Sequence, residues 1–209
     1  MRTIVLPSML ALAVLLARPI HAASDPSALE ALTQASAEIE ALARTEAKTA
    51  AETAARADRV RAEVDALLDV HAITVAALGG PSHWAERCAE RCAEVESLLG
   101  QLVRRTYLRR LESGAQGRVE ILREHVRAKA SKVDTRVHYT DARGEPKTAA
   151  VDYVMHQVQG RWRVRDILTE GASLVGNLRY ELAQLHAQGG IDEVLATLRR
   201  KVAERAENG

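Results

Sequence analysis

The chain has 209 residues, with 29 basic and 28 acidic side chains and a formal net charge of +1. This near balance excludes the basic excess that a nucleic-acid-binding surface requires. The chain contains no phenylalanine, and aromatic residues make up only 3% of it. We therefore expect leucine, valine, isoleucine and alanine to fill the core or to line any cavity.

The first 22 residues have the pattern of a secretory signal peptide. Arg2 supplies a positive start, residues 4–17 are mostly apolar, and Ile20-His21-Ala22 is an acceptable cleavage site. The apolar run is too short to span a bilayer comfortably, and a retained membrane anchor is the alternative. No cysteine follows the run, which excludes a lipoprotein anchor. Cleavage after Ala22 leaves 187 residues with 27 basic and 28 acidic side chains, and we expect a soluble, exported domain with a sizeable core.

Residues 28–78 contain neither glycine nor proline and are rich in alanine, glutamate and arginine, which predicts helix. A single helix over this stretch would be about 75 Å long, too long for a compact domain. We therefore expect two helices that meet at a weak point among Thr45, Thr49 and Thr53. The second helix should run on to the glycines at positions 79 and 80. A coiled-coil arm for a partner is the alternative.

The next helix is expected to open at Ser82 or His83, with Glu86 helping to cap it, and to stop near residue 113. Cys88 and Cys92 lie four residues apart and share one face of it. An oxidising compartment permits a disulfide, but an intact helix holds this pair near the outer limit of bridging geometry. A metal site would find only His83 as a further ligand. We expect two buried thiols that face the core, and no redox motif.

Beyond residue 117 the apolar residues change to a period of two, which is typical of strands. Residues 119–126 fit either a strand or a helical turn. Alternation over residues 133–139, 151–156 and 162–166, separated by turns, predicts an antiparallel meander with one dominant apolar face. A helix follows the meander, and a last amphipathic helix follows Gly189-Gly190.

A strand, a turn and a helix between residues 161 and 185 organise this arrangement. The apolar face of the helix must pack on the sheet to which the strand belongs. We expect Gly171 to serve the turn, Ser173 to cap the helix, and Asp166 and Glu170 to interact with its positive end. The order of elements predicts an α+β fold with N-terminal helices, an antiparallel sheet and C-terminal helices packed on the sheet. The leucines of the apolar helix face are Leu174, Leu178, Leu182 and Leu185.

Several motifs resemble those of the MlaC family, and together they cover residues 64–201 in collinear order. The most specific motif is Trp162-x-Val164-x-Asp166-Ile167-x-x-Glu170-Gly171-x-Ser173-Leu174-Val175, followed by Gly190-Ile191-Asp192-x-Val194-Leu195-x-x-Leu198. Supporting motifs are Ala76-Ala77-Leu78-Gly79, Trp84, Arg105-Thr106-Tyr107-x-x-x-Leu111, Val137-x-x-x-Asp141-x-x-Gly144-x-Pro146 and Val151-Asp152-Tyr153. The chain departs from the family in lacking phenylalanine, and its Ala-rich residues 41–57 have no counterpart that we can place.

The resemblance implies a fold similar to the nuclear transport factor 2-like cone with added helices. It divides the chain into a signal peptide (1–22), an Ala-rich helical segment (23–63) and a lipid-binding α+β domain (64–209). The family is the periplasmic phospholipid-binding component of a lipid-transport ABC system, also called the toluene-tolerance auxiliary component, which serves outer-membrane lipid asymmetry. The implied partners are phospholipid, an inner-membrane ABC transporter complex and an outer-membrane lipoprotein complex, with transient membrane contact. No cofactor, metal or nucleic acid is implied, and phospholipid is the bound ligand.

A phospholipid carrier needs a deep aliphatic cavity with a polar mouth, because each buried methylene contributes about 0.8 kcal/mol. The resemblance makes the inward residues of the strands and the facing helices candidates for its walls; a filled core is the alternative. Arg163 and Arg165 point off the apolar face and meet either a phosphate headgroup, an anionic membrane surface or solvent. The candidate wall residues are Leu102, Val103, Tyr107, Leu111, Val137, Tyr139, Val151, Tyr153, Met155, Trp162, Val164, Leu174, Val175 and Leu178.

Two other functions fit parts of the sequence. Cone folds can catalyse proton transfer with an aspartate beside a tyrosine in an apolar pocket. Here Asp134 and Asp152 fall on the polar side of the alternation, away from Tyr139 and Tyr153, and no Ser-His-Asp order or metal-ligand cluster is visible. We therefore expect no enzyme and no catalytic residues. A structural protein that binds a partner through its N-terminal helices is the other alternative, and it requires a filled core.

Overall fold

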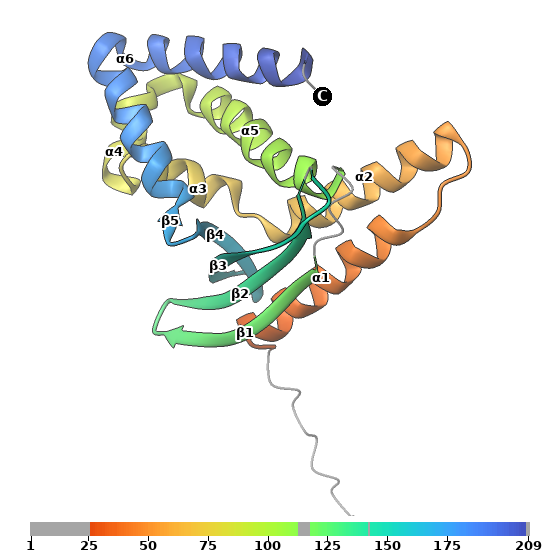
Figure 1. Ribbon diagram of the computed structural model, residues 1–209. Helices are drawn as coiled ribbons and strands as arrows, with labels where there is room; N and C mark the ends of the chain where they lie inside the picture. Colours follow the sequence, from red (N-terminus) through yellow and green to blue (C-terminus); the bar gives the residue numbers. More distant parts are fainter. Residues whose placement is uncertain (1–25, 113–117, 142, 208–209) are drawn as a thin grey trace, which may run out of the picture.

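The computed structural model describes residues 26–112, 118–141 and 143–207 (Figure 1). The helices are α1 (Ala28–Arg44), α2 (Ala50–Leu67), α3 (Val70–Ala77), α4 (Pro81–Cys88), the short 3-10 helix η1 (Ala89–Arg91), α5 (Cys92–Glu112) and α6 (Leu174–Glu207). The strands are β1 (Arg118–Arg127), β2 (Ala130–Thr140), β3 (Pro146–Val158), β4 (Arg161–Thr169) and β5 (Ala172–Ser173). They form one antiparallel sheet in the order β1-β2-β3-β4-β5. The predicted α+β fold is confirmed, and the undecided residues 119–126 belong to a strand.

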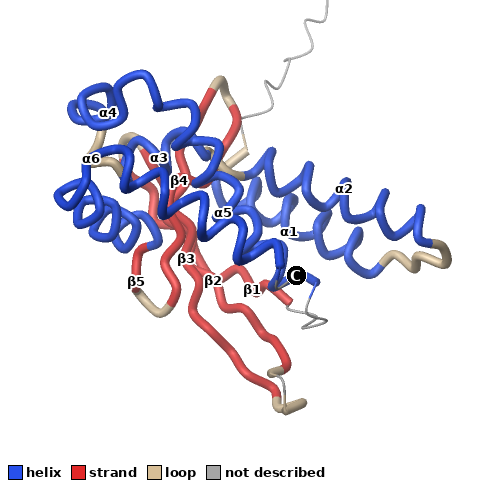
Figure 2. Tube along the Cα trace, turned by 90° about the horizontal axis from the view of Figure 1, so that it is seen from above, coloured by secondary structure: helices blue, strands red, loops and turns tan. Residues whose placement is uncertain are grey.

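The N-terminal helices α1 and α2 form a hairpin that projects beyond the sheet (Figure 2). Thr49 is the N-cap of α2: its hydroxyl accepts a hydrogen bond from the Glu52 backbone N–H, and the Glu52 carboxylate accepts one from the Thr49 N–H. This capping box satisfies backbone donors that an alanine there would leave unpaired. The predicted break among the threonines is confirmed. The base of the hairpin lies on the sheet, where α1 packs against β1 and β2.

The chain breaks again between α2 and α3, where we expected a continuous helix. The Asp69 backbone N–H donates to the Val164 carbonyl at 2.8 Å, and Leu68 forms a parallel bridge with the same residue of β4. The Asp69 carboxylate then caps α3 by accepting from the Ala72 N–H at 2.8 Å. The expectation was wrong because the partner of this break, the open edge of β4, lies far along the chain.

Cys88 and Cys92 form a disulfide, so the expectation of two buried thiols on an intact helix was wrong. Helix α4 ends at Cys88, and Ala89 takes a positive φ of 43°. This departure from helical geometry sets the two cysteine Cα atoms 4.8 Å apart, within bridging range. Helix α4 begins at Pro81, one residue before the expected start, without a side-chain cap from Glu86.

Asp166 and Ser173 make the joint between β4 and α6 as predicted. The Asp166 carboxylate accepts hydrogen bonds from the Val175 N–H at 3.0 Å and from the Ser173 hydroxyl at 2.7 Å. The Ser173 oxygen accepts from the Gly176 N–H at 2.8 Å. The joint therefore pairs backbone donors of the first turn of α6 and places a negative charge at its positive end.

Glu170 does not take part in this joint, contrary to the expectation. Its carboxylate accepts a hydrogen bond from the Ala150 N–H of β3 at 2.7 Å. Glu170 and Gly171 have φ values of 49° and 79°, a pair typical of two-residue hairpin turns. This turn leads the chain directly from β4 into β5. Farther along, Gly189 and Gly190 kink α6 at the predicted break between two helices.

The apolar residues pack in two clusters. The first joins the sheet to α1, α2, α3, α5 and the start of α6, and the second joins the end of α3 to α4, α5 and the rest of α6. Leu178 of α6 packs against both clusters. Helix α6 reaches the sheet at β4 and β5. In Figure 1, α3 to α6 accordingly lie above the sheet, whereas α1 crosses beside β1.

Candidate functional site

The helix-facing side of the sheet is fully packed at one end. Val133 of β2 lies opposite Tyr153 of β3, and Met155 of β3 lies opposite Val164 of β4. These four side chains are between 0% and 4% exposed and belong to the first apolar cluster. Helices α2 and α3 both pack against β4 here. This end is a filled core.

The same side of the sheet opens at its other end into a partly exposed surface, which we call the apolar shelf. Val119, Val137 and Ala149 lie opposite one another on β1, β2 and β3, and all three are half-buried. Tyr139, the next inward residue of β2, is 37% exposed. The β2–β3 hairpin extends beyond the helical layer at this end (Figure 2). The shelf consists of Val119, Ile121, Val137, Tyr139 and Ala149.

Most of the predicted wall residues lie on or against the first apolar cluster. Its buried members include Val103 of α5, Val175 of α6 and the strand residues Val151, Tyr153, Met155 and Val164. The partly buried residues that pack against the cluster include Val137, Trp162, Leu174 and Leu178. Leu102 belongs to the second cluster. Tyr139 lies apart, at the outer end of the shelf. Tyr107 and Leu111 belong to α5, but their side chains lie outside the described residues.

Sequence reasoning missed several residues of the same side. Ile121 packs against the cluster from β1, and Leu108 of α5 is buried in it. Alternation of Val119 and Ile121 is the signal that could have found the β1 residues, but the same stretch also fits a helical turn. Ala149 carries too little apolar surface to stand out in a pattern.

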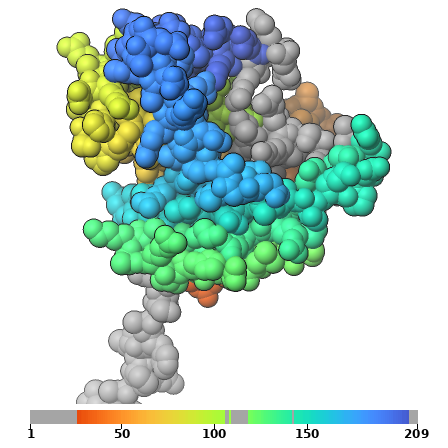
Figure 3. All heavy atoms as spheres, turned by 60° about the vertical axis from the view of Figure 1, so that its left-hand side comes forward, coloured from red at the N-terminus to blue at the C-terminus, as the bar shows by residue number. Residues whose placement is uncertain are grey.

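The outer side of the same strands carries charged side chains, and strands reach the molecular surface on this side (Figure 3). Asp134 is at its centre, with Lys132 Nζ at 2.6 Å, Arg123 Nε at 2.8 Å and His125 Nε2 at 2.7 Å from its carboxylate. Burial opposes ionisation of Asp134, but the hydrogen bonds from Lys132, Arg123 and His125 outweigh it and hold the pKa well below its usual range. Lys132 also reaches Asp152 at 3.0 Å. This arrangement neutralises charge on the outer side.

A surface hollow of about 300 Å³ lies at the outer end of the shelf. Tyr139 and Lys147 line it from opposite positions on β2 and β3. The Lys147 ammonium lies 2.7 Å from Glu145 and 3.8 Å from Asp141, and the side chain is 45% exposed. The apolar shelf therefore ends beside a hydroxyl and a cation. No group of three or more described residues has the composition and placement to hold a metal ion.

The sheet, its helical cover and the motifs placed on them agree with one family. The family model described as MlaC protein matches residues 33–200. The chain belongs to the MlaC family. MlaC proteins are generally periplasmic, and within the described part of this one no helix has the length and apolarity to cross a membrane.

A solved structure shares the fold of this MlaC protein. It is a phospholipid-binding protein from Ralstonia solanacearum in complex with a phospholipid. The two chains are 20% identical and superpose with a TM-score of 0.69, over 87% of this chain and 99% of the other. A search of curated proteins finds no match.

Proposed function

We propose that this MlaC protein is a phospholipid carrier that holds acyl chains against the helix-facing side of its sheet. One observation carries the proposal: the apolar side of the meander passes from a filled core directly into the half-exposed shelf. Thr135, which lies between the two ends on β2, does not interrupt it, because its hydroxyl donates to the Val151 carbonyl. An acyl chain laid along this side meets satisfied polar groups and aliphatic side chains.

The seam between the two apolar clusters offers the path by which a chain enters more deeply. Val103 and Val175 lie in the first cluster, Leu102 lies in the second, and Leu178 packs against both. Separating the clusters exposes these side chains, and the inserted acyl chain covers them again. Each methylene buried in this way contributes about 0.8 kcal/mol, which offsets the packing that α5, α6 and the sheet give up when they separate. The wall therefore combines strand residues with residues of both helices.

The polar headgroup is assigned to the outer end of the shelf. Tyr139 and Lys147 there offer a hydroxyl and an ammonium group to a phosphate, next to open solvent. A headgroup at this place stays hydrated while the acyl chains extend from Val137 toward Val151 and Tyr153. This orientation meets the general requirement of a lipid carrier, which is an apolar interior with a few polar groups at its mouth.

Family membership also supports a transport role. We propose that the protein, after loss of the signal peptide at residues 1–22, ferries phospholipid through the periplasm. Its partners in this role are an outer-membrane lipoprotein complex and an inner-membrane ABC transporter complex. Membership of the MlaC family and the leader-like pattern of the first residues support this assignment.

The function is tested by analysing the lipid content of the native protein. The mature chain is purified without detergent from its cells, extracted with organic solvent and examined by mass spectrometry. We expect roughly stoichiometric phospholipid. A protein that carries none, and that takes up none during incubation with liposomes, would contradict the proposal.

Two adjacent alanines provide a matched test of where the acyl chains lie. Ala149 faces the helices on the shelf, whereas Ala150 is exposed on the outer side, opposite Arg136. Ala149→Trp should fill the shelf and lower phospholipid occupancy several-fold, whereas Ala150→Trp should leave occupancy unchanged. Circular dichroism and thermal unfolding check that both variants fold. Equal occupancy in the two variants would place the lipid elsewhere.

A further inference from the structure

Strand β4 carries three arginines at alternate positions, Arg161, Arg163 and Arg165. Arg161 and Arg165 are exposed and Arg163 is partly exposed, and no carboxylate of the described residues lies within 4.0 Å of any of them. Basic side chains elsewhere are commonly paired, as Lys132 is with Asp134 and Asp152 on the neighbouring strands. The charge of the β4 arginines is therefore available to a ligand or partner with negative charge.

The strand itself directs the three guanidinium groups to one side. Arg161, Arg163 and Arg165 alternate with Trp162 and Val164, which pack on the first apolar cluster, so the arginines project from the opposite side. The pairing of β3 with β4 shifts between Met155 and Val154 and skips Arg165, which makes Arg165 the extra residue of a bulge. Bulges commonly re-aim a side chain at a strand's surface.

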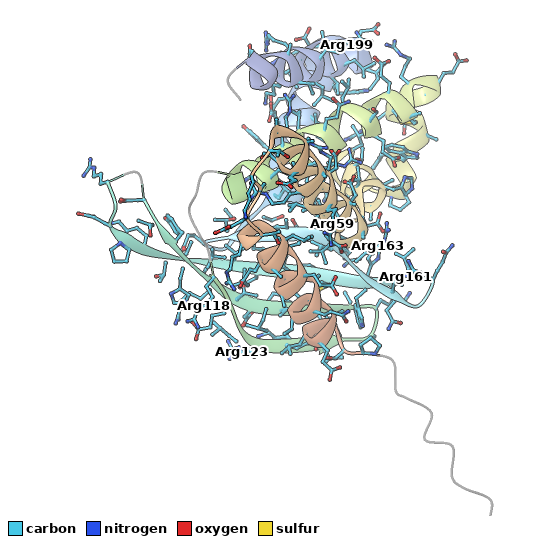
Figure 4. All side chains as sticks on the ribbon, turned by 90° about the vertical axis from the view of Figure 1, so that its right-hand side faces the viewer. Arg59, Arg118, Arg123, Arg161, Arg163 and Arg199 are labelled. Atoms are coloured by element: carbon cyan, nitrogen blue, oxygen red, sulfur yellow. A yellow bond between two sulfur atoms is a disulfide. The ribbon has the colours of Figure 1, made fainter. Side chains whose placement is uncertain are left out.

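Two acids near this surface are already engaged. Asp166, next to Arg165 in β4, accepts hydrogen bonds from the Ser173 hydroxyl and the Val175 N–H. Asp69 is hydrogen-bonded to β4 through its backbone, but its carboxylate contacts His156 Nε2 at 2.8 Å and caps Ala72. In Figure 4, Arg161 and Arg163 of β4 lie near each other, while Arg118, Arg123 and Arg199 lie on other parts of the molecule.

The described chain begins at the same place. The Trp162 indole N–H, which lies between Arg161 and Arg163 in the strand, donates to the Pro26 carbonyl at 2.7 Å. The start of the described chain therefore lies beside the arginines of β4.

We propose that Arg161, Arg163 and Arg165 form a docking surface for the phosphate groups of an anionic lipid bilayer. Guanidinium groups suit this partner because each can donate two parallel hydrogen bonds to a phosphate. The attraction adds across the three residues and is screened by salt. The inference rests on the proposed carrier function, which requires the protein to approach membranes, but it concerns a surface separate from the apolar shelf.

The test is vesicle co-sedimentation of the full mature chain, loaded with phospholipid beforehand. The variant R161Q/R163Q/R165Q is compared with R44Q/R61Q/R200Q, a control that removes the same charge from exposed helix positions whose i,i+3 or i,i+4 pairs contribute little. On vesicles of phosphatidylglycerol and phosphatidylethanolamine, each arginine should add about fivefold to the association constant, so the β4 variant should bind roughly 100-fold more weakly. The control should lose only a small part of its vesicle binding. Raised salt should release the wild-type chain from the vesicles.

Several outcomes would overturn the docking surface. One is equal vesicle binding by the β4 variant and the wild-type chain. Another is wild-type binding that does not depend on the anionic lipid, judged against vesicles of phosphatidylcholine alone; an acidic protein surface would then be the remaining partner chemistry. Phospholipid content is measured on the same samples. Loss of vesicle binding with unchanged lipid content supports the docking surface, whereas a chain that holds no lipid contradicts the carrier function itself.

Discussion

The two sides of the sheet have opposite chemistry, and on β2 a buried residue of each side can be compared directly. On β2, Val133, Asp134 and Thr135 follow one another and are 0%, 9% and 1% exposed. Val133 packs in an apolar cluster, whereas Asp134 on the other side is surrounded by three cationic or hydrogen-bonding side chains. Burial alone therefore does not mark the proposed binding side of this sheet. What distinguishes that side is an apolar surface that extends beyond the helices that cover it.

The largest expected effect comes from the packed end of the helix-facing side. Met155 is completely buried there, so Met155→Ala should destabilise the fold by about 2–5 kcal/mol through reduced burial and the cavity left behind. Urea unfolding, with its midpoint and slope, measures this destabilisation. A change below about 1 kcal/mol would show that this end is loosely packed and belongs with the shelf.

A smaller effect is expected on the outer side at Asp134. Asp134→Asn removes the charge that Lys132, Arg123 and His125 share, and should cost about 1–3 kcal/mol at neutral pH. The pKa of Asp134 is lower in the folded chain than its ordinary value of 3.8. Its contribution to stability is therefore fully present above that value and is lost as the pH falls through the lowered folded pKa.

Unfolding of the wild-type chain and the Asn variant over a range of pH checks this sign. The difference between the two should shrink on acidification, because protonated aspartate resembles asparagine in charge. A difference that stays constant in acid would mean that Asp134 acts through shape alone.

The smallest effect is expected for the exposed part of the outer side. Arg136 Nη1 lies 3.9 Å from Glu120, and the two side chains are 51% and 38% exposed. Hydrogen bonding with His138 is the main reason that the pKa of Glu120 is lowered, so Glu120 keeps its main partner when Arg136 is removed. Arg136→Ala should change stability by less than about 0.5 kcal/mol, as is usual for exposed pairs. A larger loss of stability in thermal unfolding would show that the neighbours of Asp134 on the strand also stabilise the outer side.

Local patterns were sufficient for much of the fold. The alternation around Tyr153 and Val164 predicted the meander and its apolar side, and the threonines predicted the turn between α1 and α2. Asp166 and Ser173 indicated the joint of β4 with α6, because a capping residue acts on backbone groups a few positions away. The family was also recognisable from this joint and the motifs around it.

Other features required contacts between distant parts of the chain. The break at Asp69 depends on the open edge of β4, and the side chain of Glu170 turns to Ala150 instead of the nearby helix. The prediction for Cys88 and Cys92 failed because it assumed a continuous helix, whereas Ala89 leaves helical geometry. The division of the wall residues between two clusters also depends on contacts between distant parts of the chain.

The sequence by itself therefore determined the order of the elements, the apolar side of the sheet and the family. Only the tertiary structure decided how far the helices cover that side, because coverage depends on where α1, α2 and α6 come to rest, not on the residues beneath them. It leaves Val137 and Ala149 half-exposed while Met155 is closed. It also decided which arginines are free of acids, since ion pairs form between strands and helices that no local spacing relates.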